Sequence, residues 1–336
     1  MGGISWSELF PGRWSSVIFI SYVALFINQG ILVTWSQRSG RYEYNTVAVV
    51  LMTEVLKLVI SAAFYCKDNS ILTLIQETKK NKKVLLLYMI PAFLYCLYNN
   101  LAFVNLARFD PTTYYILLQF RVVLTGIIFQ VIFRKKLSMI QWFSLIILTG
   151  GCMVKHFDVH VFDTEFHVDI SLFLILIQTT CSCLAGVYNE YLLKHQGADI
   201  DIFVQNVFMY IDSIFCNIVA IVLLTTFKNS VSDTFSNIEI SSSLQPKIIL
   251  IMLNNAIVGI ITSFFLKTLN SILKTFASAM ELIFTAVLCW ILFNIVINTN
   301  TVISIAMVSL AIILYSKNPV QNIQSKETTE SRKLLV

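Results

Sequence analysis

Long apolar runs dominate this 336-residue chain and restrict it to one kind of fold. A helix needs about 20 consecutive, mostly apolar residues to cross the hydrocarbon core of a bilayer. Ten runs of about this length are present, at 16–36, 45–66, 84–107, 112–133, 138–155, 170–192, 202–227, 248–268, 273–294 and 300–316. With 57% hydrophobic residues and a mean hydropathy of +0.75, the chain lies far outside the range of soluble domains.

The runs predict an all-α membrane protein with ten transmembrane helices. Strands of a membrane barrel would instead appear as segments of about ten residues with alternating hydrophobicity. A helix also satisfies its own backbone hydrogen bonds, which lipid requires. The joints between the runs are short, so we expect no appended soluble domain.

Lysine and arginine predict the orientation. With a cytosolic N-terminus, sixteen of the 24 basic residues fall in the cytosolic segments 1–15, 67–83, 134–137, 193–201, 267–274 and 317–336. Six fall on the opposite side, and Lys57 and Arg121 lie within runs. Because basic loops stay in the cytosol, we expect both termini there. The net charge of +5 therefore reflects topology and does not indicate nucleic-acid binding.

A loose internal repeat is visible at an offset of about 162 residues, where 103–150 aligns with 265–312. Five helices per copy would place the two copies in opposite orientations, as in secondary carriers built from inverted repeats. The predicted division is a first five-helix half (1–155), a luminal loop (156–169), a second five-helix half (170–316) and a disordered cytosolic tail (317–336).

Several ionisable residues lie inside or at the ends of the apolar runs. Such groups are costly at membrane depth and usually face a bundle interior or a water-filled cavity. They are Glu54, Lys57, Arg121, Asp212, Lys267, Lys274 and Glu281. Two or three cations at this depth suit a protein that holds an anion halfway across a membrane, so the pattern indicates a transporter.

Polar and aromatic residues accompany these charges. Helical spacing puts Arg121 on one face with Tyr114, Leu118 and Thr125, and Lys274 on one face with Ser278, Glu281 and Thr285. Further polar-aromatic patches combine Tyr95, Tyr98, Asn99 and Asn100, and Asn206, Tyr210 and Asp212. Cations can bind phosphate, tyrosine can stack on a base, and amides can bind a base edge or sugar hydroxyls. The set predicts an anionic ligand with a flat polar ring.

Structural roles compete with each of these assignments. Glu54 and Lys57 are three residues apart and can simply pair with each other. Lys267 and Lys274 border a short joint, where long side chains snorkel easily. The Asn and Tyr groups can be hydrogen bonds between helices, and Asp212 can neutralise a nearby cation. Glu190, at the end of its run, is interpreted as a surface or gate residue.

Other function classes remain open at this point. The ten-helix plan also suits a drug/metabolite-type carrier of a different solute, or a non-transporting membrane scaffold. An enzyme is disfavoured because neither a nucleophile–base set nor a metal motif is present. We expect no metal site in the histidine-bearing loop 156–169, and no cofactor.

Ordered motifs along nearly the whole chain resemble one family, the nucleotide-sugar transporters of solute carrier family 35, subfamily A. The motifs are Thr53-Glu54-Val55-Leu56-Lys57-Leu58, Tyr95-Cys96-Leu97-Tyr98-Asn99-Asn100, the stretch FVNLARFDPTTYYILLQFR, Ala185-Gly186-Val187-Tyr188-Asn189-Glu190, Gln205-Asn206-Val207-Phe208-Met209-Tyr210, and Lys267-x-x-Asn270-x-Ile272-x-Lys274. The opening third looks most like an insect member of the family that carries UDP-galactose.

The resemblance implies exchange of a cytosolic nucleotide sugar for a luminal nucleoside monophosphate across the Golgi membrane. By motif matching, Lys57, Arg121 and Lys274 would bind the phosphates. Base and ribose would fall to the cavity residues Tyr95, Tyr98, Asn99, Tyr114, Asn206 and Tyr210. Glu54, Lys267 and Glu281 would act as charge partners or gate residues. The implied partners are UDP-sugar, UMP and lipid, with a homodimer or a complex with Golgi glycosyltransferases as a further expectation.

Three departures from the family pattern bear on the substrate. Arg121 stands where lysine is usual, and Leu118 replaces a tyrosine found in carriers of CMP-sialic acid. Asp212 takes a place that is often serine or glycine, and an extra acid would disfavour a carboxylated sugar. We therefore expect a neutral UDP-hexose, UDP-galactose first and UDP-GlcNAc second.

Overall fold

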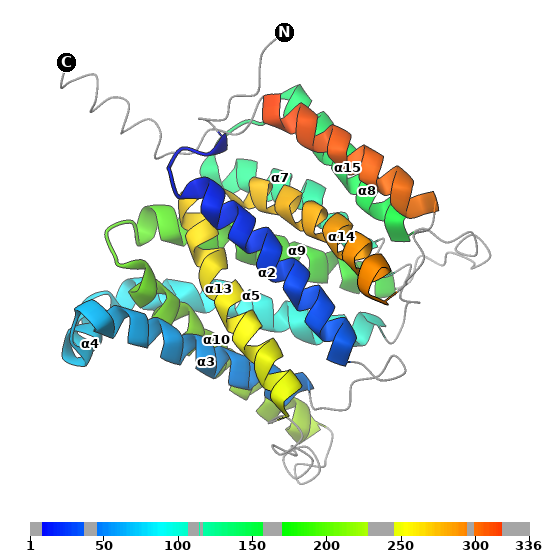
Figure 1. The fold of residues 1–336 in the computed structure, drawn as a ribbon. Helices are drawn as coiled ribbons and strands as arrows, with labels where there is room; N and C mark the ends of the chain where they lie inside the picture. The colour runs from blue at the N-terminus through cyan, green and yellow to red at the C-terminus, as the bar shows by residue number, and fades with distance from the viewer. Residues whose placement is uncertain are drawn as a thin grey trace, which may run out of the picture.

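The computed structural model describes residues 9–36, 46–106, 114, 117–156, 170–227, 245–293 and 299–317, and the regular structure in these ranges is helical (Figure 1). The helices are α2 (Ser15–Ser36), α3 (Thr46–Asp68), α4 (Ile71–Lys80), α5 (Lys82–Leu106), α7 (Arg121–Phe133), α8 (Met139–His156), α9 (Ile170–Tyr191), a π-helix (Leu192–Gln196), α10 (Ile202–Phe227), α13 (Pro246–Thr268), α14 (Ser271–Phe293) and α15 (Thr299–Lys317).

Seven helices within these ranges are long and apolar enough to cross a membrane. They contain Ser15–Leu32, Val49–Asp68, Lys82–Leu101, Leu172–Gln196, Ile202–Leu223, Pro246–Thr268 and Thr299–Lys317. Arg121–Phe133 and Met139–Val154 are shorter apolar helices. An all-helical protein with multiple membrane spans is thus confirmed. The count of ten spans and the inverted repeat stay predictions.

A turn divides one helix that the sequence predicted to be continuous. The apolar run 112–133 was expected to be a single helix, but Leu117 and Leu118 are helical, Gln119 and Phe120 form a turn, and α7 begins at Arg121. Before it, the backbone N–H groups of Phe120 and Val122 donate to the carbonyls of Leu117 and Gln119, three residues back, at 3.2 and 3.1 Å. This tighter turn changes the direction of the side chains, so helical spacing does not relate Tyr114 to Arg121.

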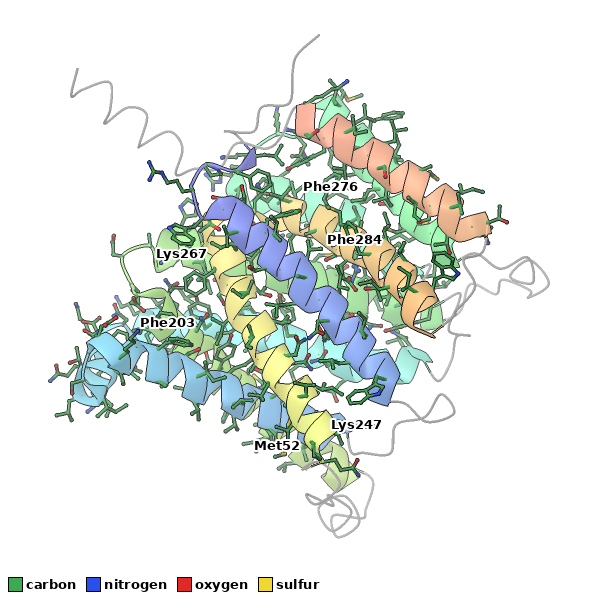
Figure 2. All side chains as sticks on the ribbon, in the orientation of Figure 1. Met52, Phe203, Lys247, Lys267, Phe276 and Phe284 are labelled. Atoms are coloured by element: carbon green, nitrogen blue, oxygen red, sulfur yellow. The ribbon has the colours of Figure 1, made fainter. Side chains whose placement is uncertain are left out.

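Contacts between aromatic rings place the predicted cytosolic joints at one end of the bundle. Phe64 near the end of α3 stacks on Phe203 at the start of α10, with ring centroids 5.4 Å apart. Phe133 at the end of α7 lies 5.8 Å from the His195 ring of the π-helix. In Figure 2, Lys267 and Phe203 lie on the side of α4, whereas Met52 and Lys247 lie at the opposite, lower end.

Helix contacts occur in matching pairs between the two parts of the chain. Helix α5 packs on α9 as α13 packs on α2, and α5 packs on α10 as α13 packs on α3. Likewise α7 packs on α9 as α14 packs on α2. In Figure 1, α2, α13 and α14 run beside one another in front of α5 and α9. The space enclosed by these helices contains the polar residues of the candidate site.

Candidate functional site

A cavity of about 380 Å³, with charged and amide side chains in a largely apolar wall, lies between α2, α3, α5, α9, α10, α13 and α14. This is within the size range of small-molecule sites in proteins. Six residues predicted from the sequence line it: Glu54, Lys57, Tyr95, Asn99, Tyr210 and Lys274. The cations at this depth therefore face a cavity, as intramembrane charges usually do.

Lys57 is fixed on three sides. Its Nζ donates to Glu54 Oε1 at 2.7 Å, and it also lies 5.6 Å from the centre of the Tyr210 ring. Its stem packs against Gly259, where a Cβ atom would approach Lys57 Cε to 2.8 Å. The side chains of the Lys57–Glu54 pair keep 16% and 14% of their exposure, so the ammonium group still faces the cavity. Lys57 therefore forms an ion pair with Glu54 and is at the same time a cation in the cavity wall.

A second cavity of about 100 Å³ adjoins the first, and Lys274 lines both. Arg121 lines the second cavity together with Gln119, Thr125, Cys183 and Ser278. Arg121 is the first residue of α7. The backbone N–H groups of Phe120, Val122 and Leu124 at this helix start already donate to backbone carbonyls. The two cations Arg121 and Lys274 therefore make this cavity suitable for an anion such as phosphate.

Tyr22 on α2 interacts with charged groups and was not among the residues selected from the sequence. The residue is 1% exposed, and its hydroxyl interacts with Ser278, Arg121 and Glu281. Arg121 and Glu281 thus both act electrostatically on Tyr22, and the expected role of Glu281 as a charge partner stays a prediction. A tyrosine within a long apolar run has no spacing signal of its own, because tyrosine is also a common packing residue.

Paired amides form a part of the wall that sequence reasoning missed. Asn28 Nδ2 donates to Asn254 Oδ1 at 2.8 Å, which joins α2 to α13. The next residue in each helix, Gln29 and Asn255, lines the cavity instead. Gln29 Oε1 and Asn255 Oδ1 are buried and accept no hydrogen bond from the residues that the structure describes. Adjacent amides inside an apolar run are the signal that could have identified them, because each is costly in lipid.

Four predicted site residues lie outside both cavity walls. The Tyr114 hydroxyl accepts a hydrogen bond from Gln178 Nε2 at 2.8 Å, and Gln178 Oε1 accepts one from Asn105. Asp212, Asn206 and Tyr98 line neither cavity. Asp212 is 4% exposed, and its Oδ2 has no hydrogen-bond partner in the described part of the chain. Direct contact of these four residues with a ligand stays a prediction.

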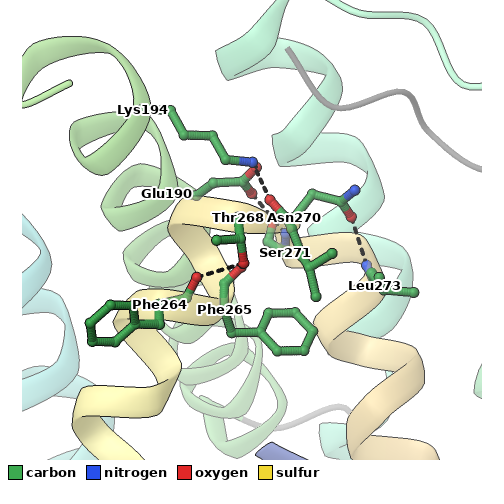
Figure 3. A network of polar contacts seen from close by, with 9 residues as sticks. Glu190, Lys194, Phe264, Phe265, Thr268, Asn270, Ser271 and Leu273 are labelled. Atoms are coloured by element: carbon green, nitrogen blue, oxygen red, sulfur yellow. Dashed lines mark hydrogen bonds and ion pairs between the residues drawn. The ribbon is translucent and has the colours of Figure 1, made fainter. Parts of the chain in front are cut away.

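A buried ion pair with its backbone hydrogen bonds, here called the clamp, joins two segments at the end of the bundle that carries the basic joints (Figure 3). Lys194 Nζ donates to Glu190 Oε1 at 2.7 Å and to the backbone carbonyl of Leu269. Glu190 Oε2 accepts the N–H of Ser271 at 2.7 Å, at the start of α14. With side-chain exposures of 1% for Glu190 and 6% for Lys194, the interpretation of Glu190 as a surface residue is wrong. The clamp ties the end of α9 to the joint between α13 and α14.

Lys267 on α13 forms a further contact at the same end of the bundle. Its Nζ donates to the carbonyl of Ile200 at 3.2 Å, and Gln205 Nε2 donates to the same carbonyl at 2.9 Å. Gln205 Oε1 accepts from the hydroxyl of Tyr88 on α5 at 2.8 Å. Lys267 thus lies at the end of the bundle and lines neither cavity, and its expected role as a gate residue stays a prediction.

These features define a helical membrane protein with a cationic, amide-lined cavity inside the bundle. Among the described residues, no group of three or more His, Cys, Asp or Glu could hold a metal ion. Most of the histidine-bearing loop 156–169 lies outside the described residues.

The chain belongs to the nucleotide-sugar transporter family, whose model matches residues 15–316. It is 52% identical to the UDP-galactose transporter senju of Drosophila melanogaster, over 98% of this chain and 96% of that protein. It is also 30% identical to CMP-sialic acid transporter 1 of Arabidopsis thaliana, over 80% of this chain and 79% of that protein. The family resemblance and the insect relative expected from the sequence motifs are both confirmed.

One solved crystal structure aligns with this chain with a TM-score of 0.63. The alignment covers 90% of this chain and 96% of the other, at 10% sequence identity. This similarity supports the fold alone.

Proposed function

We propose that this nucleotide-sugar transporter exchanges cytosolic UDP-galactose for luminal UMP across the Golgi membrane. The observation that carries the proposal is the shared wall of the two cavities, where Lys274 lies between Lys57 on one side and Arg121 on the other. Cations in a low-dielectric site can offset the charges of a diphosphate, and arginine can do so with two parallel donors.

The larger cavity offers groups that suit a nucleoside and a neutral sugar. Tyr95 and Tyr210 can provide aromatic faces, and Asn99, Asn255 and Gln29 can provide hydrogen-bonding amides. The buried acceptors of Gln29 and Asn255 fit ligand N–H and O–H donors, since a buried acceptor without a partner is costly. The expected role of Asp212 in sugar choice receives no support from the cavity wall.

Alternating access between two five-helix halves is the proposed mechanism. The matching helix pairs support an inverted repeat, because exchanging α2, α3, α5 and α7 with α9, α10, α13 and α14 preserves the packing pattern. The cavity lies between helices of both halves. Rocking of one half against the other would then expose the same cavity to each side in turn.

The clamp supports a conformation closed at its own end. Glu190 and Lys194 connect α9 to the joint before α14. The residues of α3 and α10 that line the cavity, within 49–57 and 209–217, lie in the parts of these helices farther from that joint. The basic segments at the clamp end suggest that it is cytosolic, so this conformation would be open toward the lumen. A homodimer or a complex with Golgi glycosyltransferases stays a prediction from the family resemblance.

Competition between nucleotide sugars tests the substrate. Purified protein in liposomes takes up labelled UDP-galactose in the presence of unlabelled UDP-galactose, UDP-GlcNAc or CMP-sialic acid. We expect inhibition in that order, with UMP also stabilising the protein against heat. Stronger inhibition by CMP-sialic acid would overturn the proposed substrate. Absence of any thermal shift with nucleotides would favour a carrier of another solute or a scaffold.

A further inference from the structure

Helix α4 has an amphipathic, basic surface that transport by the cavity does not explain. Ser70 caps its start, where the serine Oγ accepts the N–H of Leu72 at 3.1 Å. Leu74 is buried in a cluster with Tyr65, Tyr88 and Phe208, which fixes the inner face of the helix. Beside this buried residue, Ile71, Leu72 and Ile75 are exposed, with exposures of 55%, 66% and 45%.

Basic residues continue this exposed apolar face. Ile71, Ile75 and Lys79 are spaced by four residues and lie along one side of the helix. Lys82 and Lys83 follow directly at the start of α5, and both are exposed. We call Ile71, Leu72, Ile75, Lys79, Lys82 and Lys83 the α4 face.

The position of α4 places this face at the edge of the bilayer. The helix is ten residues long, which is too short to span, and it connects the end of the span α3 to the start of the span α5. In Figure 1 it lies at one extremity of the molecule, beyond the ends of α3 and α5. Exposed isoleucine and leucine at this level can enter the boundary between headgroups and acyl chains, as in interfacial helices.

The charge of this segment is predominantly positive. Residues 67–83 contain five lysines against Asp68 and Glu77, and Glu77 already accepts from Lys80 at 3.4 Å and from Asn81 Nδ2 at 2.9 Å. The nearby acids Asp199 and Asp201 belong to the neighbouring joint, where both interact with Lys267. Lysines beside an anionic membrane surface are attracted to it.

We infer that the α4 face is a docking surface for anionic phospholipid. The lysine side chains bind the headgroup phosphates, and Ile71, Leu72 and Ile75 contact the upper acyl chains. The long lysine stems can extend along the apolar face while their ammonium groups reach the headgroups. The amount of anionic lipid in the membrane would then determine how fully the joint between α3 and α5 is bound to the bilayer. This joint lies at the clamp end of the bundle.

Native mass spectrometry of the purified full-length protein tests this inference. The protein is titrated with dioleoyl phosphatidylserine and, separately, with dioleoyl phosphatidylcholine. We expect preferential binding of phosphatidylserine, weakened at least tenfold in the variant K79Q/K82Q/K83Q. The matched control R134Q/K136Q/K317Q also removes three positive charges at the same end of the bundle, and it should stay within twofold of the parent.

A second variant separates lipid from free phosphate. I71S/L72S/I75S keeps every lysine and alters only exposed side chains, and it should also weaken phosphatidylserine binding. Inorganic phosphate should not displace the lipid. Equal binding by both charge variants, or full binding by the serine variant, would overturn the inference. If the parent protein is a dimer and the variant K79Q/K82Q/K83Q is a monomer, the α4 face instead binds a second copy of the chain. UMP-dependent thermal stabilisation shows that each variant is folded.

Discussion

Neighbouring asparagines on α13 separate stability from ligand binding. Asn254 joins α2 through Asn28 and the carbonyl of Leu25, whereas the adjacent Asn255 lines the cavity, and its buried Oδ1 has no hydrogen-bond partner among the described residues. Two adjacent residues of the same type thus have opposite surroundings.

Replacing each asparagine with leucine should therefore give opposite results. N255L removes a costly buried acceptor, so we expect unchanged or higher thermal stability with roughly tenfold weaker UMP binding. N254L should lower stability by about 1–3 kcal/mol, because two hydrogen bonds are lost. Thermal shift measurements with and without UMP check both. A stable N255L protein with parental UMP affinity would remove Asn255 from the site.

Arg121 is the residue whose loss should affect transport most directly. R121A removes the charge that lines the second cavity, and hydrogen bonds to charged groups contribute about 1.5–3 kcal/mol each. We expect UDP-galactose uptake to fall at least tenfold with the protein still folded by size-exclusion chromatography. R121K keeps the charge but loses the two parallel donors of arginine, so its UDP-galactose uptake should lie between that of the parent and that of R121A. Unimpaired transport by R121A would contradict the phosphate assignment.

Among the helices, the sequence predicted the long apolar elements closely. Helix α10 has the predicted bounds, and α2, α3, α8 and α9 each differ by at most two residues at either end, because a lipid-facing run must stay apolar over its whole length. The turn before Arg121 escaped prediction because the run contains neither glycine nor proline there. Helix α4 and the π-helix escaped because they are short and lie in charged joints.

Charge predicted part of the candidate site. Four of the charged residues selected from the sequence, Glu54, Lys57, Arg121 and Lys274, line the cavities, whereas Asp212, Lys267 and Glu281 line neither. Lys57, Lys274 and Arg121 line the cavities because a cation inside a bundle needs a polar environment. Only some of the uncharged polar residues selected from the sequence line a cavity. Tyr95, Asn99 and Tyr210 do, whereas Tyr98, Asn206 and Tyr114 do not. Spacing along one helix cannot tell a cavity from a helix interface, because both accept polar groups.

The clamp links the end of α9 to the start of α14, and this link can be broken selectively. E190Q leaves Lys194 without its carboxylate, and losing one partner of a buried ion pair costs about 3–5 kcal/mol. We expect a lower melting temperature, together with greater labelling of a cysteine introduced at Ser271.

A paired replacement provides the control for E190Q. E190Q/K194M removes both charges, so it should recover part of the lost stability while the cysteine at position 271 stays accessible. Recovery of stability together with parental protection of that cysteine would mean that the clamp does not close the bundle.

At the scale of the whole molecule, the two cavities lie between two sets of helices that pack in matching pairs. This arrangement suits a carrier that presents one site to each side in turn and returns with a ligand bound. Nucleotide sugar and nucleoside monophosphate share the nucleoside and a phosphate, so one cationic site can hold either.

Exchange in reconstituted liposomes tests the account most directly. Liposomes that contain the purified protein and are preloaded with UMP should take up labelled UDP-galactose several times faster than empty liposomes, and R121A should abolish the difference. The two rates would be equal if the protein did not couple the entry of one nucleotide to the exit of the other, and that result would contradict obligatory exchange.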